Sequence, residues 1–264
     1  MTTTVQQIID LFLSNVAPRP NTVDTLKSGR PDKEVRKVAV TFTSTYSVIK
    51  QAVDNGADLL VTHESSYYNH RDETEWLRGN SVYEKKRELI ESSGIAIFRL
   101  HDHIHDYEPD GILAGMLKAL DWENRVIAGE HRMIELPDDK AHTVRSIAAY
   151  AKEKLGIERV LATGDPEQPV RRIALLPGAV GALRQIKYLS RPDVDLLIAG
   201  ETNEWEANEY ARDAADMGQS KALIVLGHQK SEEAGMLTVV DMLHRSFPEL
   251  EAAFVESPVA VRSL

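Results

Sequence analysis

The stretch Ile95-Ala96-Ile97-Phe98-Arg99-Leu100, followed by His101-Asp102-His103-Ile104-His105-Asp106, decides the predicted fold. Its first half is a short, mainly apolar run, which is typical of a strand buried on both faces. Two other runs have the same form, because Leu59–Thr62 ends at His63-Glu64 and Leu223–Leu226 ends at Gly227-His228. Ligands in open α/β sheets bind outside the carboxyl ends of the strands, so we expect these three histidine-bearing ends to share one crevice.

The segment from His101 to Asp106 predicts a metal site. It holds three histidines and two aspartates in six residues, a set that is expensive to bury without compensation. Imidazole nitrogen and carboxylate oxygen are the usual ligands of zinc, manganese and iron, so we expect divalent ions of this kind. If the segment stays extended, His103 points away from His101 and His105. Asp102 and Asp106 suit a ligand, a supporting acceptor or a turn residue equally.

The composition limits the class of protein. A chain of 264 residues with 42% hydrophobic residues can bury the core of one large or two smaller domains. No stretch approaches roughly 18 uninterrupted apolar residues, and the first residues lack the pattern of a signal peptide, so we expect no membrane span and no secretion. The absence of cysteine fits a reducing compartment, and we expect a cytoplasmic protein. The net charge of −10 argues against nucleic-acid binding, whereas a small anionic substrate stays compatible because a bound cation reverses the local field.

The first half of the chain alternates strands and helices, which predicts an α/β fold with a parallel sheet. The apolar periodicity and the turn residues between the runs define these elements. They are a helix at 5–16, a strand at 35–42, a helix at 46–55, a strand at 59–62, a helix at 80–92, a strand at 95–100 and a helix at 112–120.

A second α/β region begins near Trp122. The glycine-containing turn Pro177–Gly181 lacks the lysine and hydroxyl residue of a phosphate-binding loop, so we reject that function for it. The predicted domains are residues 1–122, completed by 220–264, and residues 123–219. The expected elements of the second region are a strand pair at 125–136, a helix at 143–155, strands at 160–163, 170–176 and 195–199, and a helix ending near 217.

His228 and Glu232 lie four residues apart after the last apolar run. If a helix begins at His228, the two side chains share one face. If it begins at Ser231, a residue type that caps helices, Glu232 lies in the first turn. Either arrangement can place an imidazole and a carboxylate on one ion.

The order of these motifs resembles the NIF3 family of dinuclear-metal proteins, whose members are also described as GTP cyclohydrolase I type 2 homologues. The resemblance covers nearly the whole chain. It implies two interlinked α/β domains, one or two divalent ions at the domain junction, and a homo-oligomer in the form of a toroidal hexamer. The motifs that carry it are Thr62-His63-Glu64, the His101–Asp106 segment, Gly200-Glu201, and Gly227-His228 with Ser231-Glu232.

The resemblance also implies a set of ligands. The family pattern has two adjacent histidines, then an aspartate that bridges the ions, and then a histidine and a glutamate four residues apart. Here Glu64 stands in place of the second histidine, and His105 aligns with the bridging aspartate. These two exchanges preserve roughly the ligand charge but alter the geometry, which leaves the number of ions open. The implied metal ligands are His63, Glu64, His101, His105, His228 and Glu232.

Two functions follow from a metal site of this composition. A bound ion lowers the pKa of its water and polarises a phosphoryl or amidine group, and Glu64 or Glu232 can accept the proton. The first hypothesis is therefore a metal-dependent hydrolase, for which the resemblance implies a nucleotide-like or phosphoester small-molecule substrate. The alternative is a non-catalytic metal-binding scaffold or regulatory adaptor protein, in which the coordination shell is closed.

Other polar residues fit the site less well. His70 and Tyr68 occur in a polar, aromatic loop and are expected mainly at the surface. Glu201 and Glu204 follow a strand end, where helix capping, solvation and a position in the crevice are all compatible. Three further histidines belong to no ligand pattern, and we expect structural roles for them: His131, His142 and His244.

Overall fold

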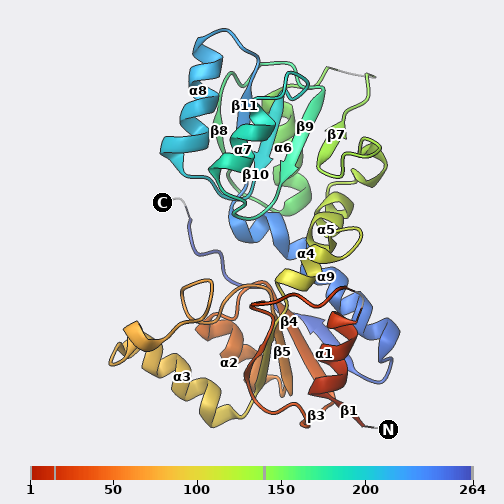
Figure 1. The fold of residues 1–264 in the computed structure, drawn as a ribbon, viewed down its shortest axis with the longest axis vertical. Helices are drawn as coiled ribbons and strands as arrows, with labels where there is room; N and C mark the ends of the chain where they lie inside the picture. The colour runs from red at the N-terminus through yellow and green to blue at the C-terminus, as the bar shows by residue number, and fades with distance from the viewer. Residues whose placement is uncertain (1, 15, 139–140, 263–264) are drawn as a thin grey trace. The chain divides into compact units, whose positions relative to one another are not determined.

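The computed structural model describes residues 2–14, 16–138 and 141–262 (Figure 1). The chain divides into two compact units. The first unit comprises Met1–Ile112 and Gly235–Val261, and the second comprises Leu113–Ala234 and Arg262–Leu264. The first unit is therefore discontinuous in sequence. The domain boundaries predicted above, with residues 1–122 completed by 220–264 and a second domain at 123–219, stay predictions.

The strands of the first unit form one five-stranded sheet and one small antiparallel pair. They are β1 (Thr3–Thr4), β2 (Leu26–Ser28), β3 (Glu34–Val35), β4 (Lys37–Thr41), β5 (Leu59–Thr62), β6 (Ala96–Arg99) and β12 (Glu251–Phe254). The large sheet has the order β12-β4-β5-β6-β2, and β1 pairs with β3. Neighbours from β12 to β6 are parallel, whereas β2 is antiparallel to β6. The parallel core follows from the strand and helix alternation, since a crossover through a helix returns the chain in the same direction.

Helices cover both faces of this sheet. The helical segments with residues in the first unit are α1 (Val5–Leu13), α2 (Tyr46–Asp54), a 3-10 turn η1 (Glu75–Leu77), α3 (Ser81–Ser93), α4 (Asp102–Asp106), α5 (Gly111–Ala119) and α9 (His228–Ser246). On one face, α1 and the C-terminal part of α9 pack against residues such as Val40 and Val61. On the other face, α2 and α3 pack against Ala39 and Leu60, which adjoin Val40 and Val61 in their strands. Side chains alternate across a strand, so consecutive apolar residues fill both layers.

Local signals place the helix ends. Thr4 caps α1, with its hydroxyl accepting the N–H of Gln7. Thr45 accepts the N–H of Val48 at the start of α2. Gly94 ends α3 in the left-handed conformation at φ 65°, which favours glycine.

The second unit repeats the same layered plan around its own sheet. Its strands are β7 (Met133–Glu135), β8 (Leu161–Thr163), β9 (Arg172–Leu176), β10 (Leu196–Ala199) and β11 (Ala222–Val225), and their order is β7-β9-β10-β11-β8. Only β9, β10 and β11 are parallel, and the two outer strands run antiparallel to them. The helical segments are η2 (Glu123–Arg125), α6 (Val144–Leu155), α7 (Ala182–Leu189), a π-helical turn η3 (Glu204–Asn208) and α8 (Glu209–Asp216), with parts of α5 and α9. Apolar clusters lie on both sides of this sheet.

The predicted α/β class is confirmed, with some local differences. The strand pair expected at 125–136 is a single strand, β7, with an isolated bridge between Val126 and Ile134. The outer strand β2 carries no continuous apolar run, and β12 alternates exposed and half-buried residues; neither is among the strands expected from the sequence. The segment after β6 is a helix rather than an extended chain. Among the described residues, every helix is too short or too polar to cross a membrane.

Candidate metal centre

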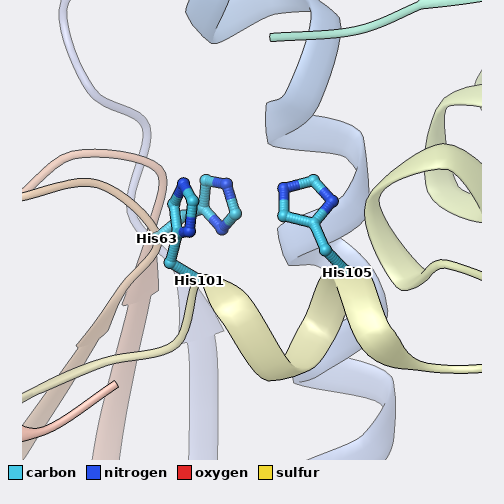
Figure 2. A group of neighbouring side chains, drawn as sticks. All are labelled: His63, His101 and His105. Carbon is cyan, nitrogen blue, oxygen red and sulfur yellow. The ribbon is translucent and has the colours of Figure 1, made fainter. Parts of the chain in front are cut away.

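Three of the predicted ligands come together within the first unit. His63 follows β5, His101 follows β6, and His105 lies on α4. The ring centroids of His63 and His101 are 4.7 Å apart, and the ring of His105 lies 5.3 Å from the first and 5.4 Å from the second. One potential ligand nitrogen of each residue lies within 4.8 Å of the others. Figure 2 shows the rings of His63 and His101 side by side, with His105 facing them. This group can hold a metal ion.

The helical form of α4 explains which histidines take part. The prediction that His103 points away assumed an extended segment, and that assumption is wrong. In a helix, residues four apart share a face, whereas a residue two positions away lies on the opposite side. His101 and His105 therefore meet, and His103 is buried on the other side, where its Nδ1 lies 2.8 Å from Asp24.

Asp24 anchors the start of this helix. Its Oδ1 accepts the backbone N–H groups of His101 at 2.7 Å and Asp102 at 2.9 Å. Its Oδ2 accepts the N–H of His103 at 2.8 Å. The first N–H groups of a helix have no partner within the helix, and a carboxylate is well suited to them. The sequence gives no signal for Asp24, because it lies 77 residues before His101, the residue that precedes the helix.

Each histidine of the group is held through its Nδ1 atom. Nδ1 of His63 lies 3.0 Å from the carbonyl oxygen of Leu100, and Nδ1 of His101 lies 3.1 Å from Oδ1 of Asp102. Nδ1 of His105 lies 3.2 Å from Asp110. Carbonyl and carboxylate oxygens only accept, so we assign the ring proton to Nδ1 in all three residues. Nε2 then carries the lone pair, which is the arrangement found in metal-binding histidines.

The charge state of His101 also suits a metal ligand. Burial, followed by the neighbouring His63, lowers the pKa of His101 to about 4. The imidazole is therefore neutral at pH 7, as metal binding requires. Oε1 of Glu64 lies 3.7 Å from Nε2 of His101, so a carboxylate borders the three rings.

The two aspartates of the predicted segment lie outside the histidine group. Burial opposes ionisation of Asp102, but hydrogen bonds from Val23, His101 and Thr22 outweigh it and lower the pKa to about 2. Asp106 forms an ion pair at 3.0 Å with Arg19.

The second unit holds the remaining predicted pair. Helix α9 begins at His228, so His228 and Glu232 share a face, with Nε2 of His228 3.1 Å from Oε2 of Glu232. Nδ1 of His228 lies 3.1 Å from Oε2 of Glu201. The imidazole thus lies between two carboxylates, of which Glu232 is almost fully buried and Glu201 is more than half exposed.

Two glycines at the strand ends make room for this helix start. A Cβ on Gly178 would overlap the carboxylate of Glu232, and a Cβ on Gly200 would overlap the hydroxyl of Ser231. The N–H of Gly178 donates to Oγ of Ser231 at 2.9 Å. The turn Pro177–Gly181, which lacks the features of a phosphate-binding loop, therefore leaves space for the start of the helix that carries His228 and Glu232.

The other polar residues considered in the sequence differ in their surroundings. His70 is an exposed residue, and its ring stands edge-on to the ring of His101 at 5.2 Å. Tyr68 is exposed, as expected for a loop. Glu204 lies exposed in η3. Nε2 of His244 lies 3.0 Å from a backbone oxygen.

Comparisons with known proteins agree with the sequence motifs. The Duf34/NIF3 (NGG1p interacting factor 3) family matches residues 7–260. This chain belongs to the Duf34/NIF3 family. A protein of Archaeoglobus fulgidus named GTP cyclohydrolase 1 type 2 homolog is 26% identical over 230 residues, which is 86% of each chain. A protein of the same name from Clostridium perfringens is 26% identical over 219 residues, covering 78% of this chain and 77% of the relative.

Solved structures share the fold. A Bacillus cereus protein related to NIF3 has a TM-score of 0.75 at 14% identity, with both chains covered completely. A NIF3 superfamily protein from Sphaerobacter thermophilus has a TM-score of 0.61 at 13% identity, covering 97% of this chain and 99% of that one.

Proposed function

We propose that this protein binds divalent metal ions and uses them to hydrolyse a nucleotide-like or phosphoester small molecule. The observation that carries the proposal is the group of His63, His101 and His105, whose Nδ1 atoms are each held by an acceptor while their rings converge. Nitrogen ligands of this kind suit zinc, manganese and iron. The names of the curated relatives, GTP cyclohydrolase 1 type 2 homolog, support a nucleotide-like substrate.

The remaining proposed ligands are carboxylates and one further imidazole. Glu64 borders the histidine group in the first unit. His228 and Glu232 face each other at the start of α9 in the second unit, and the family resemblance supports them as ligands. We propose that a homo-oligomer carries these sites, as the same resemblance implies.

The chemistry would combine the ion with a nearby base. A bound divalent ion lowers the pKa of its water and stabilises charge on a phosphoryl oxygen. In our proposal, Glu64 or Glu232 accepts the proton. The held Nδ1 atoms fix the tautomer and orientation of each imidazole, which reduces the rearrangement that metal binding requires.

Metal analysis with matched variants tests this proposal. We expect purified protein to contain Zn, Mn or Fe, and we expect His63→Ala, His105→Ala and His228→Ala to lower the metal content. His131→Ala is the control, because His131 is an exposed histidine outside the predicted ligand set. A screen of phosphate monoesters and nucleoside triphosphates with added Mn²⁺ or Zn²⁺ then tests turnover.

The outcomes separate the candidate functions. Turnover that survives His63→Ala and His228→Ala would contradict the assigned site. Stable metal binding without turnover across the whole screen would favour a metal-binding scaffold or regulatory adaptor.

A further inference from the structure

Arg99 is a fully buried cation beside the histidine group. It is the last residue of β6. Its Nε donates to the carbonyl oxygen of His63 at 3.0 Å, and its Nη1 donates to the carbonyl oxygen of His70. Its Nη2 donates to Oε2 of Glu64 at 3.1 Å. A guanidinium carries five N–H donors in a rigid fork, so one side chain holds three points of the segment that contains His63 and Glu64.

The two oxygens of Glu64 have different surroundings. Oε2 accepts from Arg99 and from the N–H of Ser65 at 3.2 Å. Oε1 is turned to the opposite side, where it lies 3.7 Å from Nε2 of His101. Charge-assisted hydrogen bonds therefore engage one oxygen and orient the other toward the proposed metal ligands.

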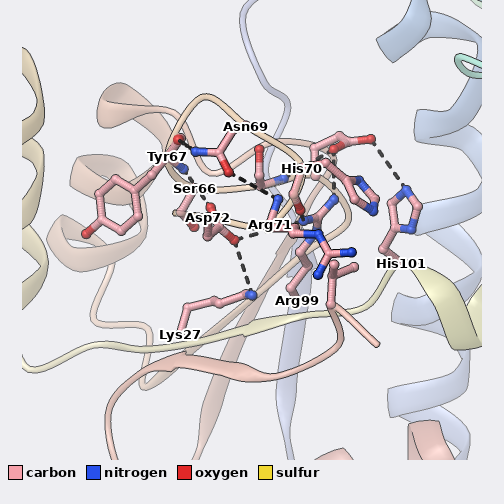
Figure 3. Close-up of polar contacts among 12 residues, drawn as sticks. Lys27, Ser66, Tyr67, Asn69, His70, Arg71, Asp72, Arg99 and His101 are labelled. Atoms are coloured by element: carbon pink, nitrogen blue, oxygen red, sulfur yellow. Dashed lines mark hydrogen bonds and ion pairs between the residues drawn. The ribbon is translucent and has the colours of Figure 1, made fainter. Parts of the chain in front are cut away.

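The loop beyond Glu64 is braced in a second way that does not involve this carboxylate. Oδ1 of Asn69 accepts the N–H groups of Arg71 and Glu73, at 3.2 and 2.9 Å. Asp72 accepts the N–H of Tyr67 at 2.8 Å and pairs with Lys27 at 3.3 Å (Figure 3). Lys27 and Arg99 therefore both tie the loop to the sheet, but only Arg99 also contacts Glu64. This difference allows the two roles of Arg99 to be separated.

We propose that Arg99 is a positioning residue that makes Glu64 a one-oxygen metal ligand directed at the side of His101. The inference rests on the proposed function, because it assumes that the histidine group binds a divalent ion. Arg99 itself touches no ion. It acts through Glu64, by occupying Oε2, and through the carbonyl oxygen of His63, by fixing the turn that delivers this histidine.

Metal affinity measured against a competing chelator tests the proposal without any need for a substrate. Supporting residues of metal ligands typically contribute about 10- to 100-fold in affinity, so we expect Arg99→Met to raise the apparent Kd for Zn²⁺ or Mn²⁺ by that factor. Glu64→Gln should have a similar effect. The double variant should be no weaker than the weaker single variant, since the two residues act as one unit.

Lys27→Met is the matched control. It removes a cation that braces the same loop but leaves the contact between Arg99 and Glu64 in place. We expect near-native affinity for this variant. Equal losses in Lys27→Met and Arg99→Met would mean that only the loop matters, and additive losses in the double variant would mean that Arg99 acts independently of Glu64. Either result would overturn the proposal.

A spectroscopic measurement gives a second readout. The visible absorption of bound Co²⁺ reports its coordination number, so Arg99→Met should change the spectrum by releasing Oε2 of Glu64, while Lys27→Met should not. Arg99→Lys, which keeps the charge but loses the fork, should fall between wild type and Arg99→Met in affinity. If Arg99→Met does not fold, Arg99→Lys combined with Glu64→Gln completes the cycle.

The result also distinguishes this inference from the proposed function. Wild-type protein that binds none of these ions would overturn both. Wild-type protein that binds metal with an affinity and a Co²⁺ spectrum unchanged by substitution of Arg99 would overturn this inference alone.

Discussion

Gly178 lies directly against the carboxylate of Glu232, so closely that a methyl group on Gly178 would overlap it. Gly178 also has a φ of 71°, in the left-handed region. Two independent constraints, a backbone angle and a contact, therefore select glycine at this strand end.

Gly178→Ala should consequently displace Glu232 and destabilise the protein. We expect a loss of about 2 kcal/mol in the free energy of unfolding, from the positive φ and the overlap together. Denaturant unfolding measures this loss, and metal analysis measures the accompanying drop in metal content. Gly181→Ala is the control, because Gly181 has a φ of 84° but open space at its Cβ position. The prediction fails if the two variants lose the same stability and keep the same metal.

Asp24→Asn should weaken the helix that carries His101 and His105. A carboxylate has two accepting oxygens, whereas the amide group of asparagine has one accepting oxygen and one donating N–H₂ group. At least one of the four donors now held by Asp24 would therefore face an N–H₂ group. Hydrogen bonds to a buried charged group stabilise strongly, and we expect a loss of about 3 kcal/mol by thermal or denaturant unfolding. Asp32→Asn, at an exposed ion pair with Arg30, should change little. An unaltered unfolding midpoint in Asp24→Asn would contradict this account of the helix start.

Lys86 should make stability depend on pH above neutrality. Its ammonium group is buried, donates to the carbonyl oxygen of Ser66 and lies over the ring of Tyr68. Burial lowers the pKa of Lys86 from 10.5 to about 8. Between pH 8 and 10.5 the unfolded chain therefore holds a proton that the folded protein has released, and the free energy of unfolding rises with pH in this window.

The variant Lys86→Met isolates this contribution. Relative to the variant, wild-type protein should gain stability from pH 8 to 10 with a slope of up to about 1.4 kcal/mol per pH unit. Urea unfolding of both proteins at several pH values measures the difference, in which all other titrating groups cancel. Parallel stability curves would show that Lys86 titrates normally.

Metal removal should lower the stability of the wild-type protein but not that of a ligand variant. An ion that binds only the folded state stabilises it by about 2.7 kcal/mol when its free concentration is 100 times its Kd. We expect added EDTA to lower the Tm of wild type, and His63→Ala combined with His105→Ala to be insensitive to it. Equal sensitivity of both proteins to EDTA would place the ion elsewhere.

The sequence predicted those features of the fold and site that depend on a local pattern of residue types. The apolar runs of β5, β6 and β11 and the histidines after them could be read directly, because buried parallel strands need apolar side chains on both faces. The separation of His103 from its neighbours was predicted for the wrong conformation. It holds in α4 because both an extended chain and a helix place residues four apart on one side and the residue between them on the other.

The contacts that hold the site could not be read in the same way. Asp24 and Arg99 are ordinary polar residues in the sequence, and their roles depend on which distant backbone groups the fold brings to them. Asp110 lies only five residues after His105 and has a local signal, since it occurs in a turn just before α5. The edge strands β2 and β12 are short and only partly buried, and neither was predicted from the sequence.

Because a chain is synthesised from its N-terminus, β12 can join the sheet of the first unit only after the other strands of that sheet have been synthesised. Residues 251–254 pair with β4, at residues 37–40, so the sheet of the first unit lacks this strand until the chain has been synthesised past residue 254. All strands of the second unit have emerged by then. A nascent chain that stalls before Glu251 exposes the unpaired edge of β4, and such an edge invites aggregation.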